Sequence, residues 1–160
     1  MQEVKAREIM SMAVHQVSPK LHLVDLENQL SEQRISGAPV VEGGRVIGIV
    51  SRSDIDRALS RERVKTAAAA TFYQPADLAE EQVAGSSVDP TGSALESLRT
   101  LTVRDVMTQE VISVEGNDSV VEVARLMESR RIHRVLVIEG GCLLGIVSAL
   151  DIARLVARWE

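Results

Sequence analysis

Cysteine and aromatic side chains are scarce in this chain of 160 residues, and each shortage excludes a class of protein. The single cysteine, Cys142, has no second cysteine to pair with, so no internal disulfide ties the fold to an oxidising compartment. We expect Cys142 to be an ordinary strand residue. One Phe, one Tyr and one Trp cannot form a base-stacking surface, and a net charge of −5 repels phosphates. We therefore expect no nucleic-acid partner.

Long hydrophobic runs and catalytic motifs are also missing. No run approaches the roughly 18 to 20 apolar residues of a membrane-spanning helix, and the N-terminal segment carries charges where a signal peptide has an apolar core. We expect a cytoplasmic protein without membrane association. The sequence has no paired acid and base, nucleophile elbow or Walker-type phosphate loop, and the spacing of His15 and His22 matches no metal motif. We therefore expect no enzyme, no metal and no catalytic cofactor.

The chain does contain an internal repeat. Residues 4–59 align with residues 101–156 without a gap, at a constant offset of 97 positions. The agreement is densest at the glycine pairs Gly43-Gly44 and Gly140-Gly141 and in the two GIVS motifs that follow them. Such a repeat indicates one structural unit written twice. It predicts three parts: a first copy at 1–60, a partly helical linker at 61–100 and a second copy at 101–160.

Both copies predict a strand followed by a helix. Each opens with a β-branched run, at 14–17 and at 111–114, that favours a strand. Apolar residues then recur with helical spacing: Leu23, Leu26 and Leu30 in the first copy, and Val120, Val123, Ala124 and Met127 in the second. Ser119 and Glu122 form a capping-box pattern at the start of the second-copy helix.

A hairpin and a second helix complete each copy. Two runs rich in Val and Ile, at 38–42 and 45–50 in the first copy, are joined by two glycines that supply the positive φ angles of a type I′ turn. The last helix begins near Ser51 and Ser148. One copy alone leaves an apolar sheet face uncovered. We therefore predict an α/β (α+β) fold in which two βαββα units pack sheet to sheet about a pseudo-two-fold axis, leaving two related clefts as ligand sites.

The linker belongs to neither copy. Residues 61–70 favour a helix, residues 85–93 are typical of a turn-rich loop, and Phe72 and Tyr73 lie between them. Two interpretations are open. The segment covers an apolar edge of the module, or it is an arm that docks a partner.

Each copy also carries a Ser-x-x-Asp motif at the start of its last helix. The free backbone N–H groups and the positive end of a helix favour anionic groups, and the carboxylate of Asp54 or Asp151 can accept hydrogen bonds from two adjacent ribose hydroxyls. A simpler interpretation is that Ser51 and Ser148 form capping boxes with these carboxylates and bind no ligand.

Four segments resemble the cystathionine-β-synthase (CBS) domains, a family that occurs as tandem pairs and often binds adenosine-containing ligands. The segments are 35–41 and 48–54 in the first copy, and 132–138 and 145–151 in the second. The resemblance implies a regulatory module that senses AMP, ADP, ATP or a related adenosyl ligand. It also implies a homodimer formed through the modules and an effector protein regulated in trans. The alternative is a ligand-free dimerisation module.

The resemblance implies ligand-binding positions in both copies. They are Gly37, Ala38, Pro39, Ser51, Arg52 and Asp54 in the first copy, and Thr108, Val111, Ile112, His133, Arg134, Ser148 and Asp151 in the second. His133 and Arg134 stand where the first copy has Ser36 and Gly37, and by resemblance they contact phosphate. A solvated basic helix end explains them equally well. The basic pair makes the second copy the first choice for a phosphorylated nucleotide.

Overall fold

A computed structural model describes residues 3–60, 72–73 and 92–159 and divides them between two compact units. The repeat-2 unit combines the second copy with the N-terminal segment: Met1–Val14, Gly44–Val46 and Ile112–Glu160. The repeat-1 unit consists of His15–Gly43 and Ile47–Val111. The first residues of each copy therefore belong to the compact unit of the other copy. Helix α1, at the start of the first copy, belongs to the repeat-2 unit, and helix α7, at the start of the second copy, belongs to the repeat-1 unit.

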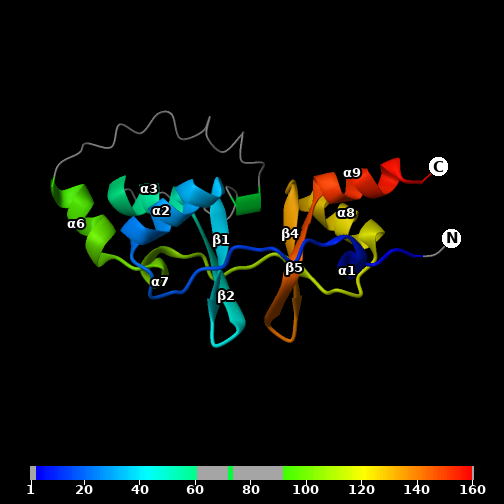
Figure 1. Cartoon of the computed structure of the whole chain (residues 1–160), viewed down its shortest axis with the longest axis horizontal. Helices are drawn as coiled ribbons and strands as arrows, with labels where there is room; N and C mark the ends of the chain where they lie inside the picture. Colours follow the sequence, from blue (N-terminus) through cyan, green and yellow to red (C-terminus); the bar gives the residue numbers. More distant parts are fainter. Residues whose placement is uncertain (1–2, 61–71, 74–91, 160) are drawn as a thin grey trace. The chain divides into compact units, whose positions relative to one another are not determined.

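The repeat-1 unit holds one small sheet and four helices among the described residues (Figure 1). Its elements are α2 (Leu23–Gln33), β1 (Gly37–Glu42), most of β2 (Arg45–Ser51), α3 (Arg52–Ser60), α6 (Gly92–Thr100) and α7 (Val103–Val106). The strand predicted at 14–17 is reduced to one parallel bridge between Val17 and Val40.

The repeat-2 unit shares the helix–strand–strand–helix order of α2-β1-β2-α3 and adds a strand to form a three-stranded sheet. Its elements are α1 (Ala6–Ile9), β3 (Ser113–Val114), α8 (Val120–Arg130), β4 (Arg134–Glu139), β5 (Cys142–Ser148) and α9 (Ala149–Ala157). The sheet order is β3-β4-β5, with β3 parallel and β5 antiparallel to β4. The strand predicted at 111–114 is thus confirmed only in its last two residues. Helix α8 supplies the crossover that a parallel β3-β4 pair requires.

Both hairpin turns have the predicted geometry. The φ angles are +57° and +78° at Gly43 and Gly44, and +57° and +85° at Gly140 and Gly141. A type I′ turn needs positive φ at both central residues, and glycine adopts these angles without a Cβ clash. The repeated glycine pair is therefore explained by turn geometry in both copies.

The predicted apolar stripes form the buried sides of α2 and α8. Leu23, Leu26 and Leu30 are fully buried in the repeat-1 core, and Val120, Val123 and Met127 are buried on α8, where the fourth predicted residue, Ala124, is half-buried. The capping box that starts α8 is also confirmed: the Ser119 N–H and hydroxyl both donate to the carboxylate of Glu122 at 2.9 Å.

The linker is described in two places. Residues 92 and 93 open helix α6, so the loop predicted over 85–93 is wrong at its end; the helix predicted over 61–70 lies outside the described residues. Phe72 and Tyr73 are buried and pack edge to face, with ring centroids 4.9 Å apart. No helix in the described part of the chain is long and apolar enough to cross a membrane.

Candidate functional site

Four of the predicted ligand residues lie at the open end of the β4–β5 hairpin, opposite the glycine turn. We call His133, Arg134, Ser148 and Asp151 the repeat-2 cluster. Arg134 is paired with Ser148 in the strand register, and α9 begins directly after Ser148. The Ala149 N–H donates to the carbonyl of His133 at 2.9 Å, which fixes the start of α9 against the start of β4. Local backbone pairing therefore brings together a carboxylate, a hydroxyl and a guanidinium.

Asp151 and Ser148 form a complete capping box. The Asp151 Oδ2 atom accepts from the Ser148 N–H at 2.8 Å and from the Ser148 hydroxyl at 2.6 Å. In return, the Asp151 N–H donates to Ser148 Oγ at 3.3 Å. The other oxygen, Oδ1, lies 3.4 Å from Arg154, whose side chain is 62% exposed. Capping thus engages mainly one carboxylate oxygen, so the cap and a ligand contact through Oδ1 are compatible.

The start of α9 offers fewer unpaired amides than the sequence suggested. The first-turn N–H of Ala149 is bonded to His133, and that of Asp151 is bonded to Ser148. The expectation that free backbone N–H groups would serve a ligand here is therefore wrong for these two.

Arg134 and His133 differ in their surroundings. The Arg134 side chain is half-buried, and this burial lowers its pKa, whereas His133 is exposed. A guanidinium stays charged at neutral pH, and partial desolvation makes an anionic partner more favourable. Of the predicted basic pair, Arg134 is therefore the residue that the fold holds partly away from water.

The repeat-1 cluster consists of Gly37, Ala38, Pro39, Ser51, Arg52 and Asp54. Asp54 is only 2% exposed, and its Oδ2 accepts from the Ser51 N–H at 2.8 Å and from the Ser51 hydroxyl at 3.0 Å. Burial raises the pKa of Asp54, opposed by the two Ser51 bonds and by Arg57, whose guanidinium lies 3.4 Å from Oδ1. The Arg52 guanidinium donates to Ser31 on α2 at 3.2 Å.

An aromatic ring from the linker lies against the repeat-1 cluster. A Cβ placed on Gly37 would meet the Phe72 ring at 3.2 Å, the Val50 carbonyl oxygen at 2.7 Å and Ser51 Cα at 3.2 Å. Gly37 is the repeat counterpart of Arg134, so Phe72 packs where the second copy carries a side chain. Sequence reasoning did not find this contact, and the only signal was the position of a rare aromatic pair in the linker.

The remaining predicted residues precede the second-copy sheet. Thr108 and Val111 belong to the repeat-1 unit and Ile112 to the repeat-2 unit. Thr108 and Ile49 exchange backbone hydrogen bonds of 2.8 Å, which places Thr108 beside β2. The equivalent neighbour of β5 is Ser11, which exchanges bonds of 2.9 Å with Ile146. Ser11 was missed because its proximity follows from the exchange of N-terminal segments between the two copies.

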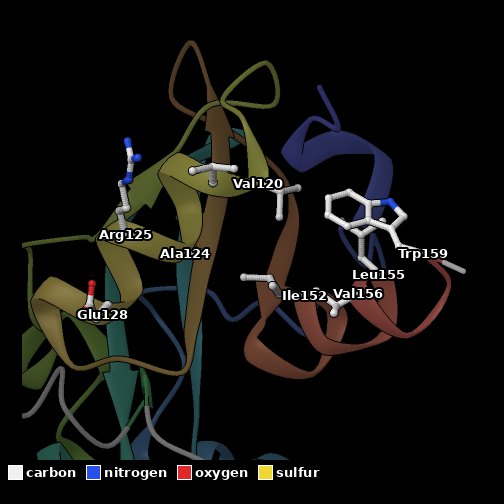
Figure 2. Close-up of a pocket in the computed structure, with 9 residues that line it drawn as sticks. Val120, Ala124, Arg125, Glu128, Ile152, Leu155, Val156 and Trp159 are labelled. Carbon is white, nitrogen blue, oxygen red and sulfur yellow. The ribbon is translucent and has the colours of Figure 1, made fainter. Parts of the chain in front are cut away.

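Several other expectations concern residues outside these clusters. Cys142 is a strand residue as predicted, exposed at the start of β5. His15 Nε2 lies 2.9 Å from the Gln29 side-chain oxygen, and His22 occupies the N-cap position of α2. Within the described ranges, no three His, Cys, Asp or Glu side chains are grouped so that they could hold a metal ion. A groove between α8 and α9, shown in Figure 2, contains none of the predicted ligand residues.

Comparison with known proteins identifies the family. The family described as CBS domain matches residues 6–61 and 103–158, which together make up more than half of the chain. The chain therefore belongs to the CBS domain family, as a tandem pair. It is also 30% identical over 133 residues to the protein MJ1426 of Methanocaldococcus jannaschii, covering 81% of this chain and 78% of that protein.

Solved structures confirm the predicted mixed α/β fold of a CBS pair. The CBS domain of a membrane protein from Sphaerobacter thermophilus has a TM-score of 0.65 and 29% identity, over 96% of this chain and 88% of that one. CBSX2, solved in complex with AMP, has a TM-score of 0.66 and 21% identity, over 98% of both chains. The CBS pair of MJ0100 was solved with 5′-methylthioadenosine and S-adenosyl-L-methionine. It has a TM-score of 0.63 and 20% identity, over 99% of this chain and 100% of that one.

Proposed function

We propose that this protein is a regulatory module that binds an adenine nucleotide or a related adenosyl ligand and acts on a partner protein in trans. The observation that carries this proposal is the repeat-2 cluster, where an Asp carboxylate and a half-buried guanidinium lie at one hairpin end. Two structurally similar CBS pairs were solved with AMP or with S-adenosyl-L-methionine and 5′-methylthioadenosine, which supports the ligand class.

The chemistry assigns complementary roles to the two charged groups. Asp151 accepts hydrogen bonds from the two ribose hydroxyls, which is the natural match for an ionised carboxylate. Arg134 pairs with a phosphate, whose oxygens fit the planar donor fork of guanidinium. His133, Ser148, Thr108, Val111 and Ile112 remain proposed ligand contacts. The repeat-1 cluster is the weaker candidate because Phe72 already packs against Gly37.

The module acts by binding rather than by catalysis. A ligand that binds one conformation or one assembly better than another shifts the population toward it, and the partner responds to that shift. We further propose that the module is cytoplasmic, associates with a second copy of itself, and holds the adenosyl ligand as a regulator and not as a catalytic cofactor.

Thermal unfolding with AMP, ADP, ATP and S-adenosylmethionine tests the proposal. A ligand at 100 times its Kd adds about 2.7 kcal/mol to the free energy of unfolding, which for a chain of this size raises Tm by roughly 5 to 11 °C. In Asp151→Ala this ligand-dependent rise is expected to vanish or to need at least about ten-fold more ligand, because a charged hydrogen bond contributes about 1.5 to 3 kcal/mol.

Glu122→Ala is the matched control, because Glu122 also completes a serine capping box in the same unit. Both variants should lose about 0.5 to 2 kcal/mol of stability from the cap. Only Asp151→Ala should lose the response to ligand. If the ligand raised Tm equally in the two variants, Asp151 would act only as a helix cap.

A ligand-free interaction module is the second candidate function. The specific observation in its favour is that Asp54 and Asp151 both accept from the serine N–H and hydroxyl of their own motifs. Unchanged Tm values of the wild-type protein across the whole adenosyl panel would favour this alternative.

A further inference from the structure

The repeat-1 cluster contains buried polar atoms that lack a hydrogen bond. Among the described residues, two buried side-chain atoms are in this state, Asp54 Oδ1 and Arg52 Nε, and both belong to the cluster. The Arg57 guanidinium lies 3.4 Å from Oδ1, which is too far for a well-formed hydrogen bond. A buried acceptor without a donor costs folding free energy, so such atoms are rare and typically mark a functional role or a bound molecule.

The surroundings of Asp54 repeat those of Asp151 in every bond. In each copy, Oδ2 accepts from the N–H and the hydroxyl of the serine, and an arginine three residues later lies 3.4 Å from Oδ1. The difference is access, because Asp54 is buried and Asp151 is partly exposed. The repeat-1 cluster therefore keeps the carboxylate geometry of the proposed repeat-2 site beneath a cover.

Two aromatic rings of the linker contribute to this cover. Phe72 and Tyr73, which we call the linker pair, are both almost fully buried and pack edge to face on each other beside β1 (Figure 1). A Cβ on Gly37 would lie 3.2 Å from Phe72 Cδ2 and also 3.2 Å from Ser51 Cα. The ring and the residue that precedes α3 thus flank the same glycine, which places the linker pair at the cluster itself.

The absence of a side chain at Gly37 also selects the kind of ligand that fits beneath the linker pair. At this position the second copy carries Arg134, the residue proposed to pair with phosphate. Ribose hydroxyls are neutral and can donate to Asp54 Oδ1, whereas a phosphate finds no counterpart of Arg134 here. The covered cluster therefore suits a nucleoside without phosphate.

We propose that the repeat-1 cluster is a second adenosyl site that the linker pair keeps closed, and that removal of the Phe72 ring opens it to a ligand without phosphate, such as adenosine. The linker then sets how many adenosyl ligands one chain holds. This inference rests on the proposed function, because it assigns the same carboxylate chemistry to the other copy, and it adds the regulation of that copy.

Isothermal titration with adenosine tests the inference on the wild type, Phe72→Ala and Leu30→Ala. The wild type should bind one adenosine per chain, at the repeat-2 cluster, and Phe72→Ala should bind two. Leu30 is the matched control, because it is fully buried in the core of the same unit. Leu30→Ala also creates a cavity, but it should still bind one adenosine. Phe72→Val lacks the Cδ2 atom that reaches Gly37 and keeps an apolar core residue, so it replaces Phe72→Ala if that variant does not fold.

Asp54→Asn, added to Phe72→Ala, identifies where the second molecule binds. It should weaken the second binding event at least about ten-fold and leave the first unchanged, because a hydrogen bond to a charged acceptor is lost only in the repeat-1 cluster. AMP provides a second comparison. It should bind more tightly than adenosine where Arg134 is present, and about as tightly as adenosine at the opened site. A second event that Asp54→Asn leaves unchanged would overturn the inference.

The titrations separate this inference from the proposed function. A folded Phe72→Ala or Phe72→Val that binds one adenosine would overturn the inference and leave the repeat-2 proposal standing. Two sites in the wild type would also overturn it, since the linker pair would then exclude no ligand. If the wild type binds none and Phe72→Ala binds one, the inference holds and the proposed repeat-2 site fails. No binding of adenosine or AMP by either protein would overturn both.

Discussion

The two Ser-x-x-Asp carboxylates differ in burial although their hydrogen bonds are alike. The side chain of Asp54 is 1% exposed, whereas that of Asp151 is 19% exposed. In both, Oδ2 accepts from the serine N–H and hydroxyl. A carboxylate with little access to water is less stable in its charged form, which explains why burial is the leading cause of the raised pKa of Asp54. The more accessible Asp151 is the better candidate for a ligand contact.

The raised pKa of Asp54 predicts a pH dependence of stability. The native state binds this proton more tightly than the unfolded state, whose pKa is close to 3.8. Ionisation of Asp54 therefore lowers the free energy of unfolding as pH rises from 3.8 through the higher native pKa. Relative to the wild type, Asp54→Asn should gain stability across this window, as measured by urea unfolding at several pH values.

Asp105→Asn provides a control of opposite sign. Asp105 forms the same cap with Thr102, but it is exposed, and the two Thr102 bonds lower its pKa. Its ionisation therefore stabilises the fold above 3.8, and that contribution is lost as pH falls through the lowered native pKa. Relative to the wild type, Asp105→Asn should lose stability as pH rises. The same slope for both variants would contradict the assignment to burial.

At the scale of elements, each unit is completed by the segment that opens the other copy. Ser11 bridges to Ile146 on β5, and Thr108 bridges to Ile49 on β2. Each segment passes over a glycine in the strand, because a side chain there would collide with the segment backbone. A Cβ on Gly48 would lie 2.7 Å from the Thr108 carbonyl oxygen, and one on Gly145 would lie 2.6 Å from the Ser11 carbonyl oxygen.

Gly145→Ala is therefore expected to destabilise the repeat-2 unit by about 1 to 3 kcal/mol, the usual cost of overpacking a close contact. The nearest atom is a backbone oxygen, and the Met10 sulfur would also lie within 2.9 Å, so a rotamer change alone does not relieve the clash. Chemical denaturation measures the loss.

Gly140→Asn is the matched glycine substitution for that experiment. A Cβ added at Gly140 would meet nothing within 4 Å, and the φ of +57° at this residue is one that Asn tolerates. Its expected effect is well below that of Gly145→Ala. If Gly145→Ala is the milder change, the close approach of the N-terminal segment does not constrain this strand.

At the scale of the whole molecule, the two copies differ in whether the linker packs against them. The linker supplies α6 to the helices of the repeat-1 unit and Phe72 to its candidate ligand cluster. The repeat-2 unit keeps Arg134 at the position equivalent to Gly37, and its helix surface is uncovered among the described elements. This asymmetry supports one ligand-binding copy and one copy closed by the linker.

The asymmetry predicts that one chain binds one adenosyl ligand. Isothermal titration with the nucleotide that gives the largest Tm shift should yield a stoichiometry near one per chain. Phe72 is only 2% exposed, so its displacement by a ligand would expose a large apolar ring and weaken binding at the repeat-1 cluster. Two sites of equal affinity would contradict the closed repeat-1 cluster.

Several features followed from sequence because they depend on short-range geometry. Paired glycines specify type I′ turns, the spacing of Leu23, Leu26 and Leu30 specifies a buried helix face, and Ser119 with Glu122 specifies a helix start. The repeat itself indicated that both copies share one fold. The strands before the helices were overestimated, because a β-branched run reports β propensity and not the presence of a pairing partner.

The amino-acid sequence by itself thus determined the repeated fold, its turns and caps, and the motif positions that place the chain in its family. Only the tertiary structure decided which segment completes which unit, that Phe72 packs on Gly37, that Ser11 lies beside β5, and how far each carboxylate is buried. These features depend on contacts between residues far apart in the chain, and local propensity and spacing carry no information about which distant segments meet.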